Sequence, residues 1–218
     1  MTDYAAARFH MVEGQIRPNK VTDHRLVEAM SELPREQFVP ESVRGIAYVD
    51  DDLPIGKGRF VMEPMVFARM LQEAGVGETE TVLDVGCAGG YSTAVLARLG
   101  ASVVGLDSDP DLVARASAAL SATGIANAAV VAGDMTGGHA AKAPYDVIVV
   151  EGTVAHIPDA LLDQLAEGGR LVAPVLNDNG VGSVRLYQRI GGVVSHRILF
   201  EAHPRTLPGF EPKPAFVF

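Results

Sequence analysis

The stretch TVLDVGCAGGYSTAVLARLGASVVGLD, residues 81–107, decides the fold class of this chain. It opens with a short, apolar and β-branched run, residues 81–85, which is typical of a strand buried on both faces of a parallel sheet. A turn crowded with glycines follows, a segment with helical spacing then ends at Gly100, and a second apolar strand ends at Asp107. This order predicts one strand-helix-strand unit of a doubly wound α/β fold.

The glycine turn and the carboxylate after it together predict a cofactor site. Gly86, Gly89 and Gly90 lack a Cβ atom, so they permit unusual dihedral angles and let a ligand lie against the main chain. Asp107 follows the first of them by about twenty residues, where a doubly wound fold places the acid that hydrogen-bonds a ribose diol. Glycine-rich turns also occur in other α/β proteins, so the prediction depends on the acid as much as on the glycines.

The glycine spacing favours S-adenosylmethionine over a dinucleotide. Dinucleotide sites use G-x-G-x-x-G because a pyrophosphate presses against the start of the helix. In this chain Ala88 and Tyr91 stand at the second and third glycine positions, which supports a pyrophosphate less well. Asp84 at the strand end would repel phosphate, but it can serve the α-ammonium group of S-adenosylmethionine, directly or through water.

Composition excludes several classes of function. The formal net charge of −9 argues against a nucleic-acid surface, and the lysines and arginines form no cluster. Cys87 is the single cysteine, so an intrachain disulfide is impossible, and the histidines lack metal-ligand spacing. The sequence shows no signal peptide and no run near the roughly 20 apolar residues of a membrane helix. We therefore expect a cytoplasmic monomer or homodimer without a metal and without nucleic-acid or membrane partners.

The chain is expected to have two parts. Residues 1–75 should form a helical and loop extension that covers the active site, and residues 76–218 the core that binds the cofactor. Residues 48–64 are acidic and then glycine-rich, which predicts an ordered loop or hairpin. The predicted helices of the extension are residues 2–15, residues 22–31 with a cap at Thr22, and residues 65–74.

Short apolar strands alternate with helical segments from residue 81 onward, which predicts a right-handed parallel sheet. The predicted strands are residues 82–85, 103–106, 129–132, 147–150 and 170–174. Two more strands, 183–190 and 193–200, are separated by Gly191 and Gly192, a two-residue hairpin signal. We therefore predict a doubly wound, mostly parallel, seven-stranded Rossmann-like sheet of the methyltransferase type, with a C-terminal antiparallel hairpin and an N-terminal helical extension.

Acidic residues follow the third and fourth predicted strands, at the edge where ligands bind in such sheets. Asp134, between Gly133 and Met135, can accept a hydrogen bond from an adenine amino group; the alternative is an aspartate that caps a turn. Glu151 ends an apolar strand, so we expect its carboxylate to be desolvated and its pKa raised. Glu151 is a candidate base, a substrate anchor or an ordinary loop residue.

Two segments are more specific than the glycine turn, namely PREQFVP at residues 34–40 and LPIGKG at residues 53–58. Weaker matches accompany them: residues 27–30, 47–50, 83–86, 90–91, 143–146, 157–162, 164–165 and 168–171. On these segments the chain resembles the protein-L-isoaspartate O-methyltransferases. The resemblance implies a cytoplasmic enzyme that uses S-adenosylmethionine to methylate the free carboxylate of isoaspartyl residues in damaged proteins and peptides, so that succinimide formation can restore aspartate.

The chain departs from this family's pattern directly after LPIGKG. The family continues with G-Q-x-I-S-x-P, and its serine lines the acceptor site as the active-site residue. Here Met62 stands in the place of the serine, Glu63 follows it, and Arg59 replaces the usual glutamine or histidine. Glu151 replaces a small residue at the end of the fourth strand. We name these four residues as candidate catalytic residues.

The departures bear on the methyl acceptor. A carboxylate acceptor needs no base, because an acid with a pKa of about 4 is already ionised at neutral pH. Losing the serine hydroxyl removes a hydrogen bond worth about 1.5–3 kcal/mol to a charged acceptor. Glu63 and Glu151 would repel an anionic substrate, whereas Lys57 and Arg59 are placed to clamp it. The same acids would favour a hydroxyl or amine acceptor that must lose a proton.

Three hypotheses therefore stay open on the sequence. The chain is an active isoaspartyl carboxyl methyltransferase, a relative that methylates a different and unidentified acceptor such as a small molecule, or a catalytically silent protein that binds the cofactor. All three require the same cofactor site. Its candidate residues are Val61, Asp84, Gly86, Cys87, Ala88, Gly89, Gly90, Asp107, Ser108, Gly133, Asp134 and Met135.

Overall fold

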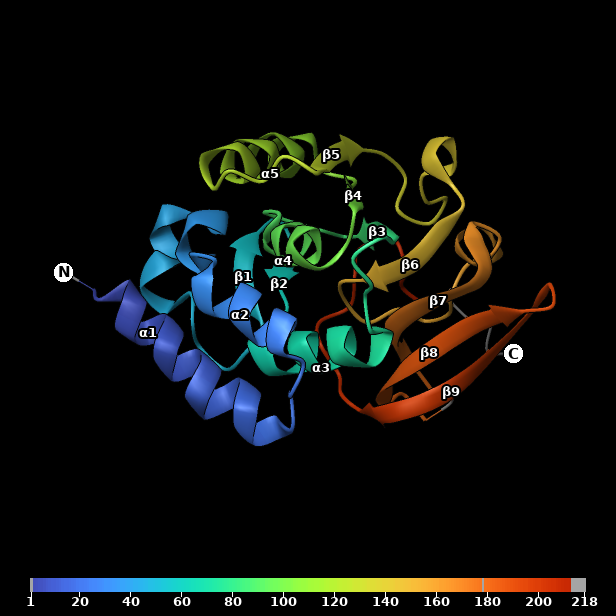
Figure 1. Cartoon of the computed structure of the whole chain (residues 1–218), viewed down its shortest axis with the longest axis horizontal. Coiled ribbons are helices and arrows are strands. Elements are labelled where there is room, and N and C mark those ends of the chain that lie inside the picture. Colours follow the sequence, from blue (N-terminus) through green and yellow to red (C-terminus); the bar gives the residue numbers. More distant parts are fainter. Residues whose placement is uncertain (1, 178, 213–218) are drawn as a thin grey trace, which may run out of the picture.

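The computed structural model describes residues 2–177 and 179–212, and its centre is a seven-stranded sheet (Figure 1). The strands are β3 Thr81–Val85, β4 Ser102–Asp107, β5 Ala128–Ala132, β6 Tyr145–Val150, β7 Leu165–Leu176, β8 Gly182–Ile190 and β9 Val193–Glu201. Their order across the sheet is β5-β4-β3-β6-β7-β8-β9. The pairs from β5 to β7 are parallel, and β8 and β9 add antiparallel strands. The predicted sheet with its C-terminal hairpin is confirmed.

The order of the strands fixes where a ligand can bind. The chain enters the sheet at β3, runs outward through β4 and β5, and then returns to place β6 and β7 on the other side of β3. Strand order thus reverses between β3 and β6, and doubly wound sheets bind ligands at the carboxyl ends of the strands at this point. The glycine turn after β3, Asp107 at the end of β4 and Glu151 after β6 all lie at this edge.

Alternate residues of the central strands enter two separate apolar cores, as the period of a strand dictates. In β3, Val82 belongs to the first core and Leu83 to the second. The first core is filled by residues of the N-terminal extension and of the helices after β3 and β4. The second is covered by Leu161 and by Leu207 and Phe210 of the C-terminal segment.

The helices are α1 Tyr4–Met11, α2 His24–Glu32, α3 Pro64–Ala74, α4 Tyr91–Leu99, α5 Pro110–Ala122 and α6 Asp159–Leu162. Short helical turns accompany them: η1 Val12–Ile16, η2 Arg17–Asn19, η3 Arg35–Phe38, η4 Glu41–Ile46 and η5 Ala140–Lys142. None of the helices in the described part of the chain is long and apolar enough to cross a membrane. Figure 1 shows α1 and α2, in blue, at the end of the molecule opposite the β8-β9 hairpin.

The N-terminal extension shares its core with the glycine-turn helix. Met30 of α2 is fully buried and lies in the same apolar cluster as Val95 of α4. Because one core includes residues of both predicted parts, packing is continuous across residues 75 and 76, and the division into two domains stays a prediction. The cap predicted at Thr22 is wrong: Asp23 accepts hydrogen bonds from the N–H groups at the start of α2.

A small antiparallel hairpin lies within the N-terminal extension. Its strands are β1 Leu53–Gly56 and β2 Arg59–Val61, and it forms a two-stranded sheet separate from the main one. At its tip Gly56, Lys57 and Gly58 all have positive φ angles, of 99°, 53° and 71°. The predicted hairpin in residues 48–64 is therefore confirmed. Met62 and Glu63, candidate residues of the acceptor site, follow β2 directly.

Candidate active site

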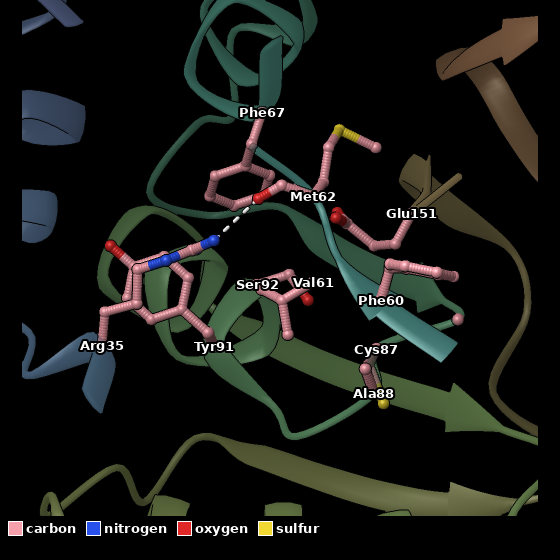
Figure 2. A pocket seen from close by; sticks show the side chains of 11 residues that line it. Arg35, Phe60, Val61, Met62, Phe67, Cys87, Ala88, Tyr91, Ser92 and Glu151 are labelled. Atoms are coloured by element: carbon pink, nitrogen blue, oxygen red, sulfur yellow. Dashed lines mark hydrogen bonds between the residues drawn. The ribbon is translucent and has the colours of Figure 1, made fainter. Parts of the chain in front are cut away.

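A small cavity lies at the carboxyl ends of β3 and β6, between the glycine turn and the β1-β2 hairpin (Figure 2). Its volume is about 10 Å³. It is lined by Arg35, Phe60, Val61, Met62, Phe67, Gly86, Cys87, Ala88, Tyr91, Ser92 and Glu151. The fold thus brings the extension, the hairpin, the glycine turn and the end of β6 to one place, including several residues that the sequence predicts for the site.

The glycine turn is shaped by its protein neighbours. A Cβ atom on Gly89 would lie 1.9 Å from the carbonyl oxygen of Phe38, so this glycine is required by the close approach of the extension. Gly86 has a φ of 83°, and a Cβ atom there would lie 2.8 Å from the side chain of Leu207. Protein groups therefore face the Cβ positions of Gly86 and Gly89, and the expectation that a ligand lies against their main chain stays a prediction.

Asp84 at the end of β3 is fully buried, and only one of its oxygens is used. Oδ2 accepts hydrogen bonds from the hydroxyl groups of Ser92, at 2.7 Å, and Thr93, at 2.6 Å. Oδ1 is buried without a partner among the described residues. Burial raises the pKa of Asp84 to about 7, although the two hydroxyl groups favour the charged form. Oδ1 of Asp84 can therefore accept a hydrogen bond from a cationic or hydrogen-donating ligand, and the ammonium group expected from the sequence is such a ligand.

Glu151 lines the same cavity from the end of β6. Its main-chain N–H donates to the carbonyl of Val85 at 2.9 Å, which fixes it beside the end of β3. Its Oε1 is buried and has no partner in the described chain. Burial, followed by the negative charge of Asp84, raises the pKa of Glu151 well above its ordinary value, while Arg35 acts in the opposite direction. The predicted desolvation agrees with this environment.

Asp107 is fully buried at the end of β4, and both oxygens of its carboxylate accept hydrogen bonds. Oδ1 accepts from Nη1 of Arg59 at 2.7 Å and from the N–H of Asp109 at 3.0 Å, and Oδ2 accepts from the N–H of Ala88 at 2.9 Å. Nη2 of Arg59 donates to the carbonyl of Gly86 at 3.0 Å. Arg59 thus lies where the sequence predicts a ribose.

Lys57 is bound to the same edge of the sheet. Its exposed Nζ lies 2.9 Å from the carboxylate of Asp109 and 2.7 Å from that of Asp111. These two acids raise the pKa of Lys57. Both Lys57 and Arg59 are paired with carboxylates of the cofactor edge in this structure, and the expectation that they clamp a substrate carboxylate stays a prediction.

Arg35 is a site residue to which the sequence analysis assigns no role. Its side chain is 1% exposed, Nε donates to the carbonyl of Ala47 at 2.8 Å, and Nη2 donates to the carbonyl of Met62 at 2.8 Å. The guanidinium carbon lies 4.7 Å from the ring centroid of Tyr91. Figure 2 shows Arg35 and Glu151 on opposite sides of the cavity. The sequence does carry one indication of a role for Arg35: it is the single cationic residue in the family-specific segment of residues 34–40.

Of the four candidate catalytic residues, Met62 and Glu151 line the cavity. Met62 is 4% exposed and belongs to the first apolar core. Glu63 is not among the residues that line this cavity; it is half-buried, and its N–H donates to Asp52 at 3.0 Å. Burial and then the charge of Asp52 raise the pKa of Glu63 to about 7.

The residues after β5 lie apart from the cavity. Asp134 is exposed, and its Oδ1 accepts from the N–H and the hydroxyl of Thr136 at 2.9 Å and 2.8 Å. This is the turn-capping arrangement that the sequence analysis names as the alternative. Met135 is buried, while Ser108 and Gly133 are exposed at the strand ends. A role for these residues in binding adenine stays a prediction.

The C-terminal segment covers one side of the site. The N–H of Thr153 donates to the carbonyl of Arg205 at 3.0 Å, and the N–H of Leu207 donates back to Thr153 at 2.9 Å. Leu207 and Phe210 are buried. A second small cavity lies between this segment and the hairpin, with Glu151 in its lining. Residues 203–210 therefore form a wall of the site. The segment LPGFEPKPAFVF, residues 207–218, departs from the family's usual ending and its role is open on the sequence; its last six residues lie outside the described chain.

Within residues 2–177 and 179–212, no group of three or more His, Cys, Asp or Glu side chains is arranged to hold a metal ion.

The family model described as protein-L-isoaspartate(D-aspartate) O-methyltransferase (PCMT) matches residues 7–202. The chain belongs to this family. The predicted resemblance is confirmed over most of the chain, including the segment around Met62 where the PCMT pattern is broken.

Curated members of the PCMT family are similar to this chain over most of its length. The protein-L-isoaspartate O-methyltransferase of Methanoculleus marisnigri is 41% identical over 186 residues, covering 85% of this chain and 84% of its own. Protein-L-isoaspartate O-methyltransferase 1 of Rhodopseudomonas palustris is 42% identical over 174 residues, covering 80% of this chain and 71% of its own.

Solved structures agree with this assignment. A protein-L-isoaspartate O-methyltransferase matches with a TM-score of 0.80 and 26% identity, covering 93% of this chain and 66% of its own. A Plasmodium falciparum β-aspartate methyltransferase (PCMT), solved in complex with S-adenosyl-L-homocysteine, has the same fold, with a TM-score of 0.78, 19% identity and coverage of 95% and 99%. PCMT membership confirms the predicted class, a methyltransferase that depends on S-adenosyl-L-methionine.

Proposed function

We propose that this PCMT family member methylates the free carboxylate of isoaspartyl residues in proteins and peptides, as the names of its relatives describe. One observation carries the proposal: the cavity has the buried guanidinium of Arg35 on one side and Glu151, with an unpartnered carboxylate oxygen, on the other. Ser92 in the lining donates to Asp84, whose second oxygen is also unpartnered among the described residues. Such a site is complementary to a cation and an anion held against each other, which is the charge pattern of a sulfonium donor and a carboxylate acceptor.

The donor side fits S-adenosylmethionine. The unpartnered Oδ1 of Asp84 and Oε1 of Glu151 are acceptors that an ammonium group satisfies, and buried acceptors of this kind are otherwise rare. Asp107 and the N–H of Ala88 lie where the fold holds a ribose. When bound, the cofactor supplies a methyl group on a positively charged sulfur, which a carboxylate oxygen accepts to give a methyl ester.

On the acceptor side, the reaction needs a correctly positioned carboxylate and the exclusion of water. Because a free carboxylate is ionised at neutral pH, no residue has to remove a proton. The lining of Phe60, Met62 and Phe67 excludes water, which strengthens the attraction between the acceptor and the charged donor. Arg35 supplies positive charge at the edge of this apolar surface, and its two main-chain hydrogen bonds hold it still. The protein thereby contributes orientation and desolvation.

The decisive experiment uses radiolabelled S-adenosylmethionine with two peptides that differ only in an isoaspartyl or aspartyl linkage. We expect base-labile methyl incorporation into the isoaspartyl peptide alone. Incorporation into neither peptide at high enzyme concentration rejects the proposal. Asp107→Asn serves as a variant with a damaged cofactor site. It should lower the affinity for S-adenosyl-L-homocysteine by about tenfold, because the two ribose hydroxyl groups lose their charged acceptor.

A second candidate function rests on Glu151. A carboxylate with a raised pKa beside the cofactor edge is suited to accept a proton from a hydroxyl or amine acceptor. Under this alternative the enzyme methylates such an acceptor and ignores the isoaspartyl peptide. The ester and the amine or ether products differ in stability to base, so the chemical lability of the label on a panel of acceptors separates the two functions. Labelling of nothing, with cofactor bound, indicates the catalytically silent relative.

We further propose a cytoplasmic location, supported by the buried single thiol of Cys87 and by the proposed repair of intracellular proteins. The oligomeric state, monomer or homodimer, also remains a proposal. Gel filtration with light scattering distinguishes the two states directly.

A further inference from the structure

Arg59 fills the position of a ligand within the cofactor edge. Its guanidinium is enclosed by the carboxylate of Asp107 at 2.7 Å, the carbonyl of Gly86 at 3.0 Å and the sulfur of Met135 at 3.9 Å. The Arg59 side chain is 4% exposed, and that of Asp107 is fully buried. These three partners come from the ends of β3, β4 and β5, so the guanidinium spans the region where the fold holds an adenosine.

The guanidinium and a ribose compete for the same acceptor. Both oxygens of the Asp107 carboxylate already accept hydrogen bonds, from Arg59, Asp109 and Ala88. The two main-chain donors belong to the framework of the site, and Arg59 is the donor on a movable hairpin. A ribose diol that binds Asp107 therefore replaces Arg59.

The size of the site also indicates a closed form. The cavity beside the glycine turn and the one behind Arg59 each have a volume of about 10 Å³. That is room for about one water molecule. Pockets that hold drug-sized ligands measure roughly 300–1,000 Å³. A nucleoside cofactor therefore enters only after the hairpin that carries Arg59 has moved.

We propose that the β1-β2 hairpin is a lid over the cofactor site, latched by the buried ion pair between Arg59 and Asp107. This rests on the proposed function, since it assumes that the cofactor binds at Asp107. Cofactor entry exchanges the guanidinium for the ribose hydroxyl groups. The buried carboxylate keeps a partner in both states, which avoids the high cost of an unpaired buried charge.

The hairpin is a separate two-stranded sheet and makes no ladder with the seven-stranded one. Isolated two-stranded hairpins are marginally stable, so its position depends on side-chain contacts. Leu53 and Ile55 of β1 are buried in the first apolar core, and Arg59 of β2 pairs with Asp107. β2 runs directly into Met62, which lines the acceptor side. Opening for the cofactor therefore also moves the acceptor wall, and the lid couples the two binding events.

The test measures how fast S-adenosyl-L-homocysteine binds. The chain has no tryptophan, and Pro54 is exposed on β1 opposite Phe60, so Pro54→Trp places a single fluorescent reporter on the hairpin. In stopped-flow mixing we expect the observed rate to level off at high ligand concentration, because opening limits it. Arg59→Gln in this background should raise that plateau by about tenfold, since the latch reduces the competent fraction.

Two controls make the result decisive. Asp111→Asn removes only an exposed ion pair and should change the plateau by less than about twofold. Arg59→Lys keeps the charge with a shorter reach and should give an intermediate plateau, and melting curves identify any variant that fails to fold. An unchanged plateau in Arg59→Gln, or a lower affinity at an unchanged association rate, overturns the latch.

The same titration separates this inference from the proposed function. If the parent protein does not bind S-adenosyl-L-homocysteine by calorimetry, the cofactor site itself is misplaced and both proposals fail. If it binds without a plateau that responds to Arg59→Gln, the latch fails while the methyltransferase proposal stands.

Discussion

Nη2 of Arg35 donates a hydrogen bond of 2.8 Å to the carbonyl oxygen of Met62, and this bond is drawn as the dashed line in Figure 2. Within the N-terminal extension, it joins the segment of residues 34–40 to the residue that replaces the family serine. Because Nε of Arg35 also holds the carbonyl of Ala47, one guanidinium ties three segments together at the cavity. The extension is therefore part of the active site as well as its cover.

Replacing Arg35 by methionine should destabilise the protein by about 2–4 kcal/mol, because two buried carbonyl groups lose their donor. The measurement is the free energy of unfolding in urea. Arg98→Met is the matched control: Arg98 is half-exposed and lies 3.8 Å from Glu32, so this change should cost less than about 1 kcal/mol. Equal effects of the two changes would contradict the structural role of Arg35.

Met62→Ser should raise the kcat/KM for an isoaspartyl peptide by about tenfold or more, because the new hydroxyl donates to a charged acceptor. Since Met62 is buried in the first core, the same change should lower stability by about 2–4 kcal/mol. Met62→Ala makes a similar cavity without the hydroxyl and should share only the loss of stability. If Met62→Ala also gains activity, the gain comes from the enlarged cavity and not from a hydroxyl group.

Glu63 should make stability fall as pH rises. Its folded-state pKa of about 7 exceeds its ordinary value of 4.5, so folding favours the protonated form. This contribution is fully present below pH 4.5 and is lost as the pH rises through 7. Glu63→Gln should therefore gain of order 1 kcal/mol more at pH 8 than at pH 5, a figure reduced for the partial exposure of the side chain.

Urea unfolding at the two pH values checks the Glu63 prediction, and the exposed Glu41 provides a control through Glu41→Gln. A gain for Glu63→Gln that is the same at pH 5 and pH 8 would count against an effect of the carboxylate charge.

Gly89→Ala should cost about 3 kcal/mol or more, because its Cβ atom would overlap the carbonyl of Phe38 and the backbone there must shift. Gly14 has nothing within 4 Å of a Cβ atom. Gly14→Ala should therefore stabilise by about 0.5–1 kcal/mol through the unfolded state. The midpoints of thermal unfolding of the two variants test both predictions. If Gly89→Ala is as stable as the parent protein, the main chain at Phe38 can shift to accommodate the Cβ atom.

The fold could be predicted from the sequence because its signals are local. A β-branched strand, a glycine turn and a helix that stops at Gly100 follow one another within residues 81–107, and each is visible in neighbouring residues. The hairpin between β8 and β9 is equally local at Gly191 and Gly192. The cap of α2 was misplaced by one residue, since Thr22 and Asp23 both have capping side chains and only geometry selects between them.

The partners within the site were harder to predict because they are distant in sequence. Arg35 bonds to main-chain carbonyls 12 and 27 residues away, and such acceptors leave no trace in residue identity. Arg59 was recognised as a functional cation, but its charge alone does not indicate that Asp107, 48 residues later, is its partner. Asp134 was placed at the correct edge, yet its turn with Thr136 is a local contact that competes with any ligand.

Leu207 packs where a Cβ atom of Gly86 would lie, so the last part of the chain closes a wall around the first motif of the core. During synthesis the chain emerges from the ribosome with its N-terminus first, and domains begin to fold as they emerge. The extension and the sheet are therefore made before residues 203–210 are available. A nascent chain would have the sheet but an incomplete site until residues 203–210 have been made, so the site is completed after the sheet.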